Sequence, residues 1–464
     1  MATFVNREDE LARLDEWWNR TGEGSIGLVW GRRRVGKTLL VQRFAEDKRA
    51  VFHTGAGRPV EDELAQLSRS AATVLAGGLR DVAARPFTDW EDALETFAAA
   101  ARSEPLLLVL DEFPTLVDVA PELENRLRAF WDRAQAQSKL RILLLGSALR
   151  TMERIQTERA PLYGRIDLSL LVHPFRPHEA ALMLRRLKPA DRALVYGLVG
   201  GVPLYLEWWD QRASVRDNLL RLVCTPGGQL LNEGELVLAS ELDLSDLGRR
   251  IVYAVATGRT KFNEIQQVVR TDPTRTLDRL GQLRIVEKVV PVTADPRRAR
   301  TNFYRIADNL LAFWLATVDR YRAEIDRGLG RSVLPVLVSD LDDHLGERYE
   351  EAFRSHLRRL ADAGGLGEGI VAIGPFWADQ PQQVQIDAVA LAGRDRTAVL
   401  VGESKWARTA DASRLSRVLA AKAQALPKRA ADLRYAVCAR ERLTHVPRDA
   451  LAFTAADIFR VNAA

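Results

Sequence analysis

The chain has 464 residues, 47% of them hydrophobic and 28% charged, with a formal net charge of +5 and a sequence pI near 9.3. This composition is typical of a soluble globular protein with two to four domains, and the modest positive charge permits nucleic-acid binding without requiring it. The sequence shows no apolar run of the ~20 residues that span a bilayer, and only Cys224 and Cys438 could form a disulfide or bind zinc as thiolates. The first residues do not resemble the apolar part of a secretory signal, so none is expected. We therefore expect a cytoplasmic protein without a membrane partner.

The first expected element is a helix over residues 8–20, in which leucine and tryptophan side chains share one face. An apolar strand over residues 26–30 comes next. That strand runs directly into Gly31-Arg-Arg-Arg-Val-Gly-Lys-Thr38, which has the spacing and the strand–loop–helix setting of a phosphate-binding P-loop. The pattern predicts binding of ATP or GTP.

The residues of this loop have separate expected roles. Gly31 and Gly36 let the backbone turn its N–H groups toward a polyphosphate, and the following helix adds the positive end of its dipole. Lys37 would reach the β- and γ-phosphates, and the Thr38 hydroxyl would ligate Mg²⁺. The predicted nucleotide-binding residues of the loop are Gly31, Val35, Gly36, Lys37, Thr38 and Leu39.

A pair of acids follows a second apolar run. Residues 105–114 read Pro-Leu-Leu-Leu-Val-Leu-Asp-Glu-Phe-Pro, a run that suits the buried centre of a parallel sheet. Strand ends of such sheets line the ligand crevice, so Asp111 is expected to hold magnesium through water and Glu112 to orient or deprotonate the attacking water. The alternative is a solvated helix start. A third strand, over residues 141–145, ends at Ser147, which offers a polar group beside the γ-phosphate.

Strands and helices alternate through the rest of this region, with further strands expected at 50–54 and within 161–172 and helices at 60–77, 88–102 and 121–137. The alternation predicts a doubly wound parallel sheet in residues 1–172. Residues 173–237 are helical only, interrupted by Gly200-Gly-Val-Pro203, and this pattern predicts a helical lid.

The next region carries three short helical patterns followed by two strand-like pieces, at 246–256, 261–269, 273–283, 285–292 and 301–306. Three helices with a two-stranded wing are the pattern of a winged helix-turn-helix, which we assign to residues 238–330. Arginines of its third helix and of the turn between its strands would contact DNA phosphates, and these are Arg275, Arg279, Arg297, Arg298 and Arg300. The alternative is a winged helix that serves as a protein–protein spacer.

The last part of the chain contains a predicted hairpin, with strands at 384–391 and 398–406. Because side chains alternate along a strand, one face is expected to carry Val399, Val401, Glu403 and Lys405. A charge on such an apolar face costs free energy unless it is paired or binds a metal.

Asp387, Glu403 and Lys405 stand in an Asp-x(15)-Glu-x-Lys arrangement on this hairpin, which is the layout of the PD-(D/E)xK nuclease superfamily. The carboxylates of Asp387 and Glu403 would hold Mg²⁺, and Lys405 would position a hydroxide or stabilise the pentacovalent phosphate. Glu350, at the start of a predicted helix, would be a supporting acid. The alternative is a buried Glu403–Lys405 ion pair in a site that no longer cleaves.

Together these motifs resemble those of the prokaryotic "archaeal ATPase" family, a branch of the STAND and AAA+ P-loop NTPases. Its members carry a C-terminal domain of unknown function that is similar to PD-(D/E)xK nucleases. The resemblance spans nearly all of the chain. It rests on Phe4-Val-Asn-Arg-Glu8, Gly31–Thr38, Leu110-Asp-Glu-Phe-Pro114, Gly146-Ser147, Pro161-Leu-Tyr-Gly-Arg165, Gly200-Gly-Val-Pro203, Tyr304-Arg-Ile-Ala-Asp308, Phe313-Trp314, Ile386-Asp387 and Glu403-Ser-Lys405.

The resemblance implies further roles. Residues from Phe4 to Arg7 would lie near the adenine, which favours ATP over GTP. Arg165 would be a γ-phosphate or finger arginine. Pro203 would end the lid element that senses the base.

The expected fold is therefore α/β and multidomain: a P-loop NTPase parallel sheet with a helical lid, a winged helix-turn-helix, and a C-terminal PD-(D/E)xK-like α/β domain in residues 331–464. The leading hypothesis is an ATP-hydrolysing molecular switch whose nucleotide state repositions the winged helix and the nuclease-like domain on DNA. The alternative is a non-cleaving protein in which ATP gates binding of nucleic acid or of another protein. The expected cofactors are ATP and Mg²⁺, and the expected partners are DNA and either a protein partner or a second copy of the chain. The single P-loop disfavours a translocating motor.

Overall fold

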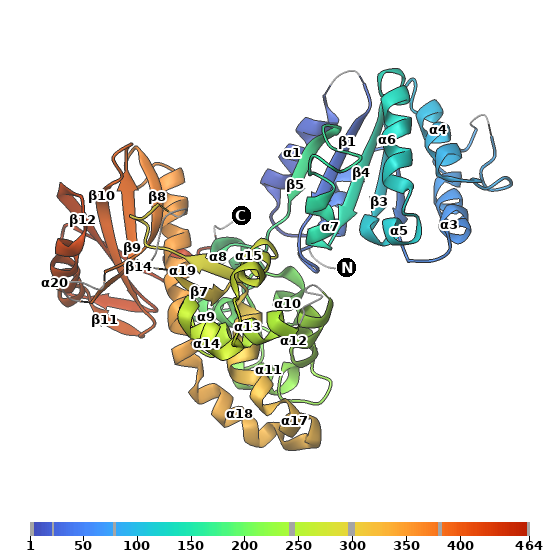
Figure 1. The fold of residues 1–464 in the computed structure, drawn as a ribbon. Helices are drawn as coiled ribbons and strands as arrows, with labels where there is room; N and C mark the ends of the chain where they lie inside the picture. The colour runs from blue at the N-terminus through green and yellow to red at the C-terminus, as the bar shows by residue number, and fades with distance from the viewer. Residues whose placement is uncertain are drawn as a thin grey trace. The chain divides into compact units, whose positions relative to one another are not determined.

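The structure is a computed structural model that describes residues 4–20, 23–77, 80–240, 246–295, 302–378 and 383–461. The chain divides into two compact units, Met1–His173 and Pro174–Ala464. Figure 1 shows the strands and helices of both units. Each unit has its own sheet and core, and each is described separately below.

The first unit is built on a parallel sheet of five strands in the order β2-β3-β4-β1-β5. The strands are β1 (Ser25–Trp30), β2 (Ala50–Thr54), β3 (Leu106–Asp111), β4 (Leu140–Gly146) and β5 (Ile166–Leu171). Every residue of β1, β3 and β4 is buried, as their near-continuous apolar sequences require. The predicted parallel sheet is therefore confirmed.

Helices cover both faces of this sheet (Figure 1). On one face, α1 (Glu8–Trp18) and α2 (Lys37–Ala45) pack Trp17, Leu40 and Phe44 against the strands. The other face carries α3 (Val60–Ala72), α4 (Trp90–Ala100), α5 (Phe113–Val119), α6 (Leu123–Ala134) and α7 (Leu149–Arg154). The sequence analysis missed α5 and α7, because helices of seven and six residues are too short to show a helical period.

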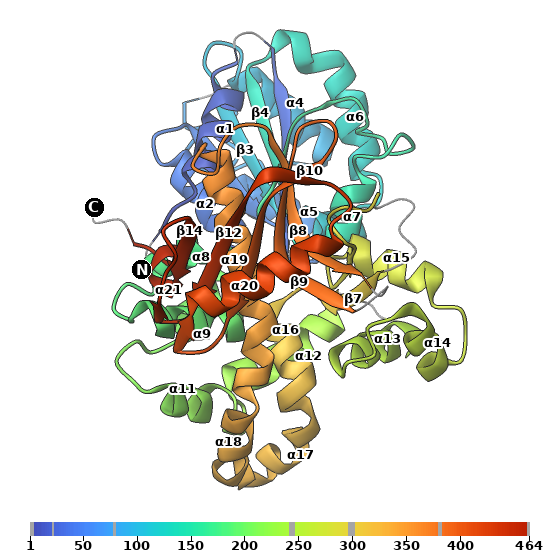
Figure 2. The same cartoon turned by 90° about the vertical axis from the view of Figure 1, so that its left-hand side faces the viewer.

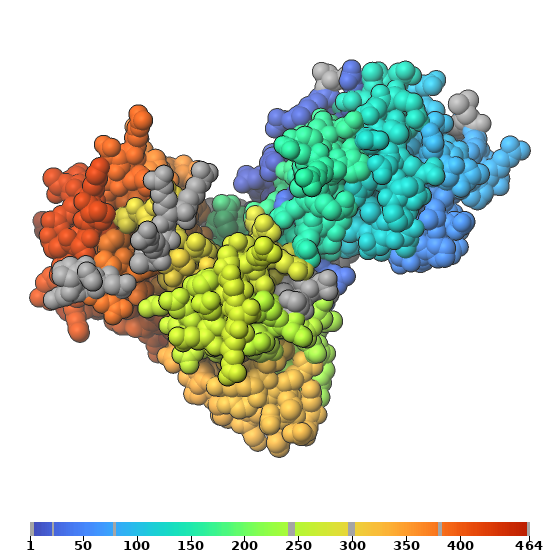
Figure 3. Space-filling view, in the orientation of Figure 1, coloured from blue at the N-terminus to red at the C-terminus, as the bar shows by residue number. Residues whose placement is uncertain are grey.

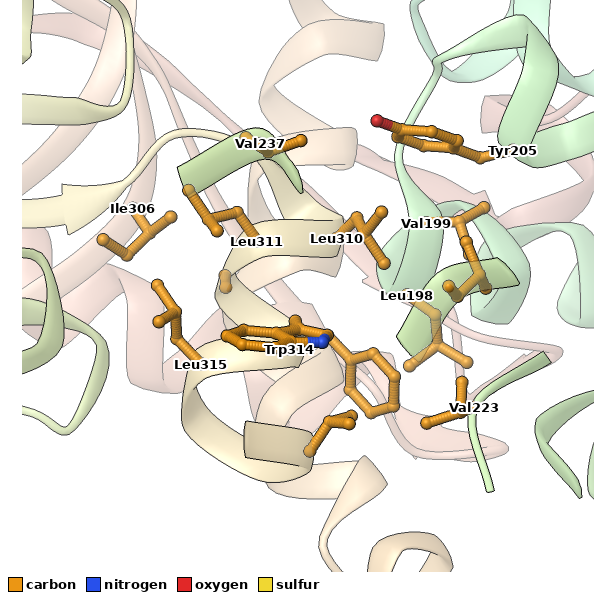
Figure 4. Packing of buried hydrophobic residues seen from close by; sticks show 14 of the residues in the cluster. Leu198, Val199, Tyr205, Val223, Val237, Ile306, Leu310, Leu311, Trp314 and Leu315 are labelled. Carbon is orange, nitrogen blue, oxygen red and sulfur yellow. The ribbon is translucent and has the colours of Figure 1, made fainter. Parts of the chain in front are cut away.

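The second unit begins with a bundle of helices: α8 (Pro177–Met183), α9 (Pro189–Val199), α10 (Pro203–Trp208), α11 (Val215–Leu222) and α12 (Gln229–Ser240). Later in the chain α16 (Asn309–Phe313), α17 (Arg322–Glu324) and α18 (Gly330–Ser339) join them. The core of the bundle is centred on Trp314, which lies among Leu310, Leu311 and Leu315 in Figure 4. The Trp314 indole donates a hydrogen bond to Leu231 O at 2.8 Å, so its polar atom is satisfied within the core.

Three helices and two strands follow the bundle, namely α13 (Asp246–Ala256), α14 (Phe262–Val269), α15 (Thr274–Gln282), β6 (Val286–Val289) and β7 (Phe303–Ile306). The two strands pair antiparallel, with Val286 opposite Ile306. Leu277 and Leu280 of α15 are buried in the same core as the helix bundle. The predicted order of three helices and two strands is present, and its identification as a winged helix-turn-helix stays a prediction.

The C-terminal sheet has five strands in the order β14-β12-β10-β9-β8. The bounds are β8 (Ile370–Ala378), β9 (Val384–Ala392), β10 (Thr397–Lys405), β12 (Arg429–Ala439) and β14 (Ala450–Thr454). Strands β9 and β10 form the expected antiparallel hairpin, whereas β10, β12 and β14 run parallel. Two short strands, β11 (Thr409–Asp411) and β13 (Arg442–Thr444), pair with each other beside it.

Helices cover both faces of this sheet as well. Figure 2 shows α20 (Ala412–Lys422) crossing the near face and α19 (Leu341–Asp362) behind the sheet. Phe353 and Leu357 of α19 pack on Ala388 and Leu400, in a core that also receives Ala181 from α8. The C-terminal sheet and the helix bundle therefore belong to one compact unit, which ends with α21 (Ala455–Ile458).

The expected alternation of side chains along β10 is wrong at its start. The register with β9 shifts between Ala398 and Leu400, so the strand contains an irregularity of the bulge type. As a result Val399 packs with the core on the α19 side, whereas Val401 lies in the core under α20. Glu403 contacts Lys422 of α20 and so keeps the face of Val401 but not that of Val399.

The β6–β7 segment also contacts the C-terminal sheet. The Val292 N–H donates to Pro375 O at 2.7 Å, and the Arg396 guanidinium donates to Val292 O at 2.7 Å. In the space-filling view the yellow residues of this segment lie among the orange residues of the sheet (Figure 3). Although α19 is 22 residues long, no helix in the described ranges is both long and apolar enough to cross a membrane.

Candidate functional site

The P-loop connects β1 to α2 and depends on two glycines. Gly31 has φ +151°, and a Cβ there would lie 2.3 Å from Val172 O, so a side chain cannot be accommodated. Gly36 has φ +89° and precedes the first helical residue, with open space where its Cβ would be. The left-handed backbone at Gly36 turns the chain from the loop into the helix. A helix N-terminus in this setting is a favourable place for an anion.

Lys37 lies across this loop. Its side chain is buried, and Nζ donates to Gly31 O and Arg32 O at 2.9 Å each. The ammonium group is therefore already held over the loop in which a triphosphate would sit. This position agrees with the phosphate-binding role predicted for it, which stays a prediction.

Thr38 and Asp111 meet at the same edge of the sheet. The exposed Thr38 Oγ1 donates to Asp111 Oδ2 at 2.8 Å, and Asp111 Oδ1 accepts the Glu112 N–H at 2.9 Å. Asp111 ends β3 and Thr38 is the second residue of α2, so the contact joins two predicted metal-binding groups. A hydroxyl and a carboxylate this close are hard oxygen ligands of the kind that Mg²⁺ takes together with phosphate oxygens.

Glu112 occupies the next position along the chain. It has φ +49°, a left-handed conformation that is uncommon for a residue with a side chain, and it precedes α5. The Ser147 hydroxyl donates to its carboxylate at 3.2 Å. Since β4 lies between β1 and β3, the serine that follows β4 stands between the P-loop and the acid pair. The strand order thus explains why Ser147 and Glu112 meet.

The loop after β2 supports the acid pair, which the sequence analysis did not foresee. The Gly55 N–H donates to Asp111 O at 2.9 Å. Glu63 Oε1 accepts two further N–H groups of this loop at 2.9 and 3.0 Å, and Glu63 Oε2 lies 2.9 Å from His53 Nε2. Burial lowers the pKa of His53, despite the neighbouring carboxylate. The only sequence signal for Glu63 is that it lies in an acidic first turn, which marks many helices.

Arg7 links the P-loop to the end of the first unit. Its guanidinium is buried and donates to Val35 O at 3.0 Å and to His173 O at 2.8 Å. Val35 is fully buried and Leu39 is half-buried on α2. The hydrogen bond to Val35 O ties Arg7 to the P-loop. Its predicted position near an adenine stays a prediction.

Arg165 and Pro203 are the remaining residues predicted for the nucleotide. The Arg165 guanidinium donates two hydrogen bonds to the Asp132 carboxylate of α6, from Nε to Oδ1 at 2.6 Å and from Nη2 to Oδ2 at 2.9 Å. The hydrogen bond to Asp132 raises the pKa of this arginine. Any γ-phosphate role of Arg165 therefore requires release from Asp132. Pro203 is the first residue of α10 in the second unit.

A second cluster of charged groups lies on the C-terminal sheet. Asp387 Oδ2 accepts the Ser404 N–H at 2.8 Å, which places its carboxylate at the end of β10 beside Glu403. Burial and then the charge of Glu403 raise the pKa of Asp387. Burial and then the charge of Asp387 raise the pKa of Glu350 to about 8. The structure thus brings Asp387 beside Glu403, and Glu350 is near enough for the charge of Asp387 to raise its pKa.

Two lysines also reach this cluster. Glu403 Oε1 accepts from Lys405 Nζ at 2.8 Å, and Glu403 Oε2 accepts from Lys422 Nζ at 2.8 Å. Burial alone would lower the pKa of Lys405, but the hydrogen bond and charge of Glu403 raise it. Within the described ranges, no three His, Cys, Asp or Glu side chains are arranged to hold a metal ion by themselves. A cation here would bind Asp387 and Glu403 together with phosphate or water oxygens.

Lys422 and Arg354 are the residues that sequence reasoning missed in this cluster. Arg354 is buried on α19 and donates to Asp387 O at 2.7 Å and to Glu351 at 2.8 Å. Both residues reach the strands from helices that are distant in sequence. Their roles arise from tertiary packing, and neither has a motif of its own.

The structure describes only two of the five arginines that were predicted to contact DNA. Arg275 is exposed on α15, and Arg279 on the same helix is half-buried. Arg297, Arg298 and Arg300 lie outside the described residues. DNA contact by this surface stays a prediction.

Two regions of the chain match families of known proteins. Residues 4–208 match the family described as an ATPase domain predominantly from Archaea. Residues 314–416 match a family of archaeal and bacterial proteins of unknown function. The first match supports an ATP-binding, ATPase-like function for that region of the chain.

The chain is also similar to individual proteins. An uncharacterized protein of Methanocaldococcus jannaschii is 25% identical over 415 residues, covering 87% of each chain. An uncharacterized ATP-binding protein of the same organism is 46% identical over 46 residues, which is 10% of this chain and 76% of that one. The Walker-type ATPase of Pyrococcus abyssi aligns with a TM-score of 0.52 at 18% identity, over 67% of this chain and 96% of that one. This last likeness supports the P-loop ATPase fold.

Proposed function

We propose that this chain is an ATP-hydrolysing switch whose magnesium–triphosphate site lies at the ends of β1, β3 and β4. The observation that carries the proposal is the 2.8 Å contact between Thr38 Oγ1 and Asp111 Oδ2 beside the loop that Lys37 crosses. Bound magnesium would neutralise charge on the β- and γ-phosphate oxygens. Thr38 and Asp111 would hold it, and Lys37 would exchange its carbonyl contacts for phosphate oxygens.

Glu112 would orient the attacking water or accept its proton in this proposal. Its carboxylate lies one residue beyond Asp111, and the Ser147 hydroxyl holds it in place. The left-handed backbone at Glu112 is a strained arrangement of the kind that clusters at functional sites. Ser147 is then a positioning residue for Glu112.

The switching part of the proposal rests on Arg7. Because Arg7 bridges Val35 O in the P-loop and His173 O at the end of the first unit, a change in loop conformation reaches the residue before Pro174 through two hydrogen bonds. Nucleotide binding would favour one arrangement of this bridge over another, which is a population shift. The second unit would respond to this change in conformation.

ATP hydrolysis by the full chain tests the proposal. Phosphate release is measured with Mg²⁺ and with a chelator, for the wild type and for Asp111→Asn. We expect Mg²⁺-dependent release that falls by about 10²-fold in Asp111→Asn, because a metal-holding oxygen is lost. Asp118→Asn, an exposed aspartate on α5, is the matched control. Equal rates in the wild type and in Asp111→Asn would contradict the proposal.

For the second unit we propose a metal-dependent phosphodiesterase site at Asp387 and Glu403. The raised pKa values of Asp387 and Glu350 support it, because buried carboxylates that repel one another are stabilised by a divalent cation. Lys405 would stabilise the charge on the phosphate, and the β6–β7 segment with α15 would contact the DNA backbone.

A second candidate function is nucleic-acid or protein binding without cleavage. It is favoured by the two lysines on Glu403, which already neutralise both of its oxygens. Calorimetry with Mn²⁺ and a panel of linear, nicked and branched DNA, on the full chain and on Asp387→Asn, separates the two candidates. Strand breaks that Asp387→Asn abolishes support cleavage. If the wild type neither takes up metal nor breaks any DNA strand, the result supports binding without cleavage.

A further inference from the structure

The second unit contains a cavity of about 1470 Å³ beside the carboxylates of the C-terminal sheet, with Glu350 in its wall. Its wall includes residues of α14, β7, α19, β8 and β9. The cavity is larger than the ~300–1,000 Å³ of ordinary small-molecule sites. It therefore suits a segment of a polymer better than a compact metabolite.

Aromatic side chains form one part of the wall. Phe303 of β7 and Trp377 of β8 both line the cavity, with ring centroids 5.0 Å apart and planes inclined at 47°. Both residues are only half-buried, so their rings are not fully covered by protein. Phe262, at the start of α14, adds a third ring. Rings of this kind are stacking platforms for unpaired bases.

Cationic groups continue along the wall. Lys261 is exposed at the start of α14, and Lys422 lines the cavity while holding Glu403. Arg348 also lines the cavity; its Nε is buried and has no hydrogen-bond partner in the part of the chain that the structure describes. Two acids of the wall have partners of their own: Glu264 accepts the backbone N–H groups of Thr260 and Lys261, just before α14, and Asp340 pairs with Arg320.

The contacts around the cavity limit what can enter. The β6–β7 segment is tied to the sheet by the hydrogen bonds between Val292 and Pro375 and between Arg396 and Val292. Arg305 of β7 also pairs with Glu351 of α19 at 3.0 Å. A duplex keeps its bases stacked inside and offers only its grooves to a protein. A wall of aromatic rings and cations instead matches bases that have left the stack.

We propose that this cavity binds a single-stranded polynucleotide segment. Its bases would stack on Phe303 and Trp377. Its phosphates would pass from Lys261 along Arg348 to Lys422, which delivers a phosphodiester to the carboxylates beside Glu403. The inference rests on the proposed nucleic-acid role of the second unit and names its substrate as single-stranded.

Fluorescence anisotropy with the full chain tests this inference, using labelled oligo(dT) and a blunt duplex of equal length. Measurements without ATP and with a chelator make the result independent of both proposed activities. We expect tighter binding of the single strand and a loss of about tenfold or more in Trp377→Ala, the effect of one lost stacking contact. Lys261→Gln should weaken binding and reduce its salt dependence by about 0.7 in slope.

Matched controls separate this loss from misfolding. Trp18→Ala replaces a half-buried tryptophan of α1, and Lys188→Gln replaces an exposed lysine that precedes α9 as Lys261 precedes α14. Both should bind like the wild type. If duplex binds as tightly as oligo(dT), or if Trp377→Ala binds like its control, the inference is overturned.

A second measurement does not depend on any variant. Oligonucleotides that carry 5-iododeoxyuridine are crosslinked by light to the wild-type chain, and the modified peptides are mapped by mass spectrometry. We expect crosslinks at Phe303 and Trp377. Crosslinks confined to α15 would place the strand on the outer surface and contradict the cavity. An inactive ATPase with these crosslinks intact would leave this inference standing while the ATPase proposal fails.

Discussion

The Thr38 hydroxyl lies 2.8 Å from the Asp111 carboxylate, although the two residues are 73 positions apart in the chain. The contact exists because β1 and β3 run parallel in one sheet, so the turns that follow them meet at the same edge. Ser147, after the intervening β4, completes the group by its hydrogen bond to Glu112. Four polar residues from three strand ends thus share one small region with the P-loop.

Replacing Lys37 tests the loop as a phosphate site. Lys37→Ala removes the buried ammonium group that would contact the phosphates. A hydrogen bond to a charged group contributes about 1.5–3 kcal/mol. We expect ATP affinity to fall by about 10- to 100-fold. Calorimetric titration with ATP and Mg²⁺ measures the change. Lys139→Ala, an exposed lysine at the start of β4, should bind as the wild type does; unchanged affinity in Lys37→Ala would rule out the phosphate contact.

Ser147→Ala tests the positioning of Glu112. The substitution removes the 3.2 Å hydrogen bond and leaves the carboxylate free to rotate. We expect kcat to fall by about tenfold with KM nearly unchanged, because the serine is proposed to act on the water-orienting group and not on substrate binding. Steady-state kinetics measure both parameters, with Ser103→Ala, an exposed serine, as control. A change confined to KM would show that Ser147 acts on the nucleotide instead.

The half-buried His344 makes the stability of the second unit depend on pH. Burial lowers the pKa of His344 to about 3, helped by the charge of Arg348, while its Nε2 lies 3.2 Å from Gly197 O. The unfolded chain binds this proton below pH ~6.5 and the folded chain does not, so stability is present above that pH and is lost as the pH falls. The loss attributable to His344 is about 2 kcal/mol at pH 5.

Urea unfolding at pH 7.5 and 5.0 measures this dependence. We expect His344→Gln to lose less stability on acidification than the wild type, because glutamine can donate to Gly197 O without titrating. His445→Gln, a histidine whose side chain is 75% exposed, is the control and should behave as the wild type. Equal losses in His344→Gln and in the wild type would assign the acid sensitivity to other groups.

The parts of the site that the sequence predicts are those with a local pattern. Gly31, Gly36 and Lys37 are recognisable because a strand, a loop and a helix are contiguous in the chain. Asp111 is recognisable because it ends an apolar strand. That these residues lie close together could be predicted from one rule, namely that the carboxyl ends of parallel strands lie at the same edge of a sheet.

The parts that the sequence does not predict arise from tertiary packing. Glu63 supports the acid pair from α3, and Lys422 reaches Glu403 from α20, in each case without a motif. The irregularity near Val399 also could not be predicted, because alternation along a strand assumes that no residue is inserted in the ladder. The fold of the first unit was therefore more predictable than the electrostatics of the second site.

The most direct test of the central claim is ATP turnover by Glu112→Gln, compared with ATP binding by the same variant. Glutamine keeps the shape of Glu112 and an oxygen that accepts from Ser147, but it cannot take a proton from water. We predict wild-type ATP affinity and phosphate release reduced by 10²- to 10⁴-fold, with Glu122→Gln, the residue before α6, unaffected. Undiminished phosphate release by Glu112→Gln would contradict the account.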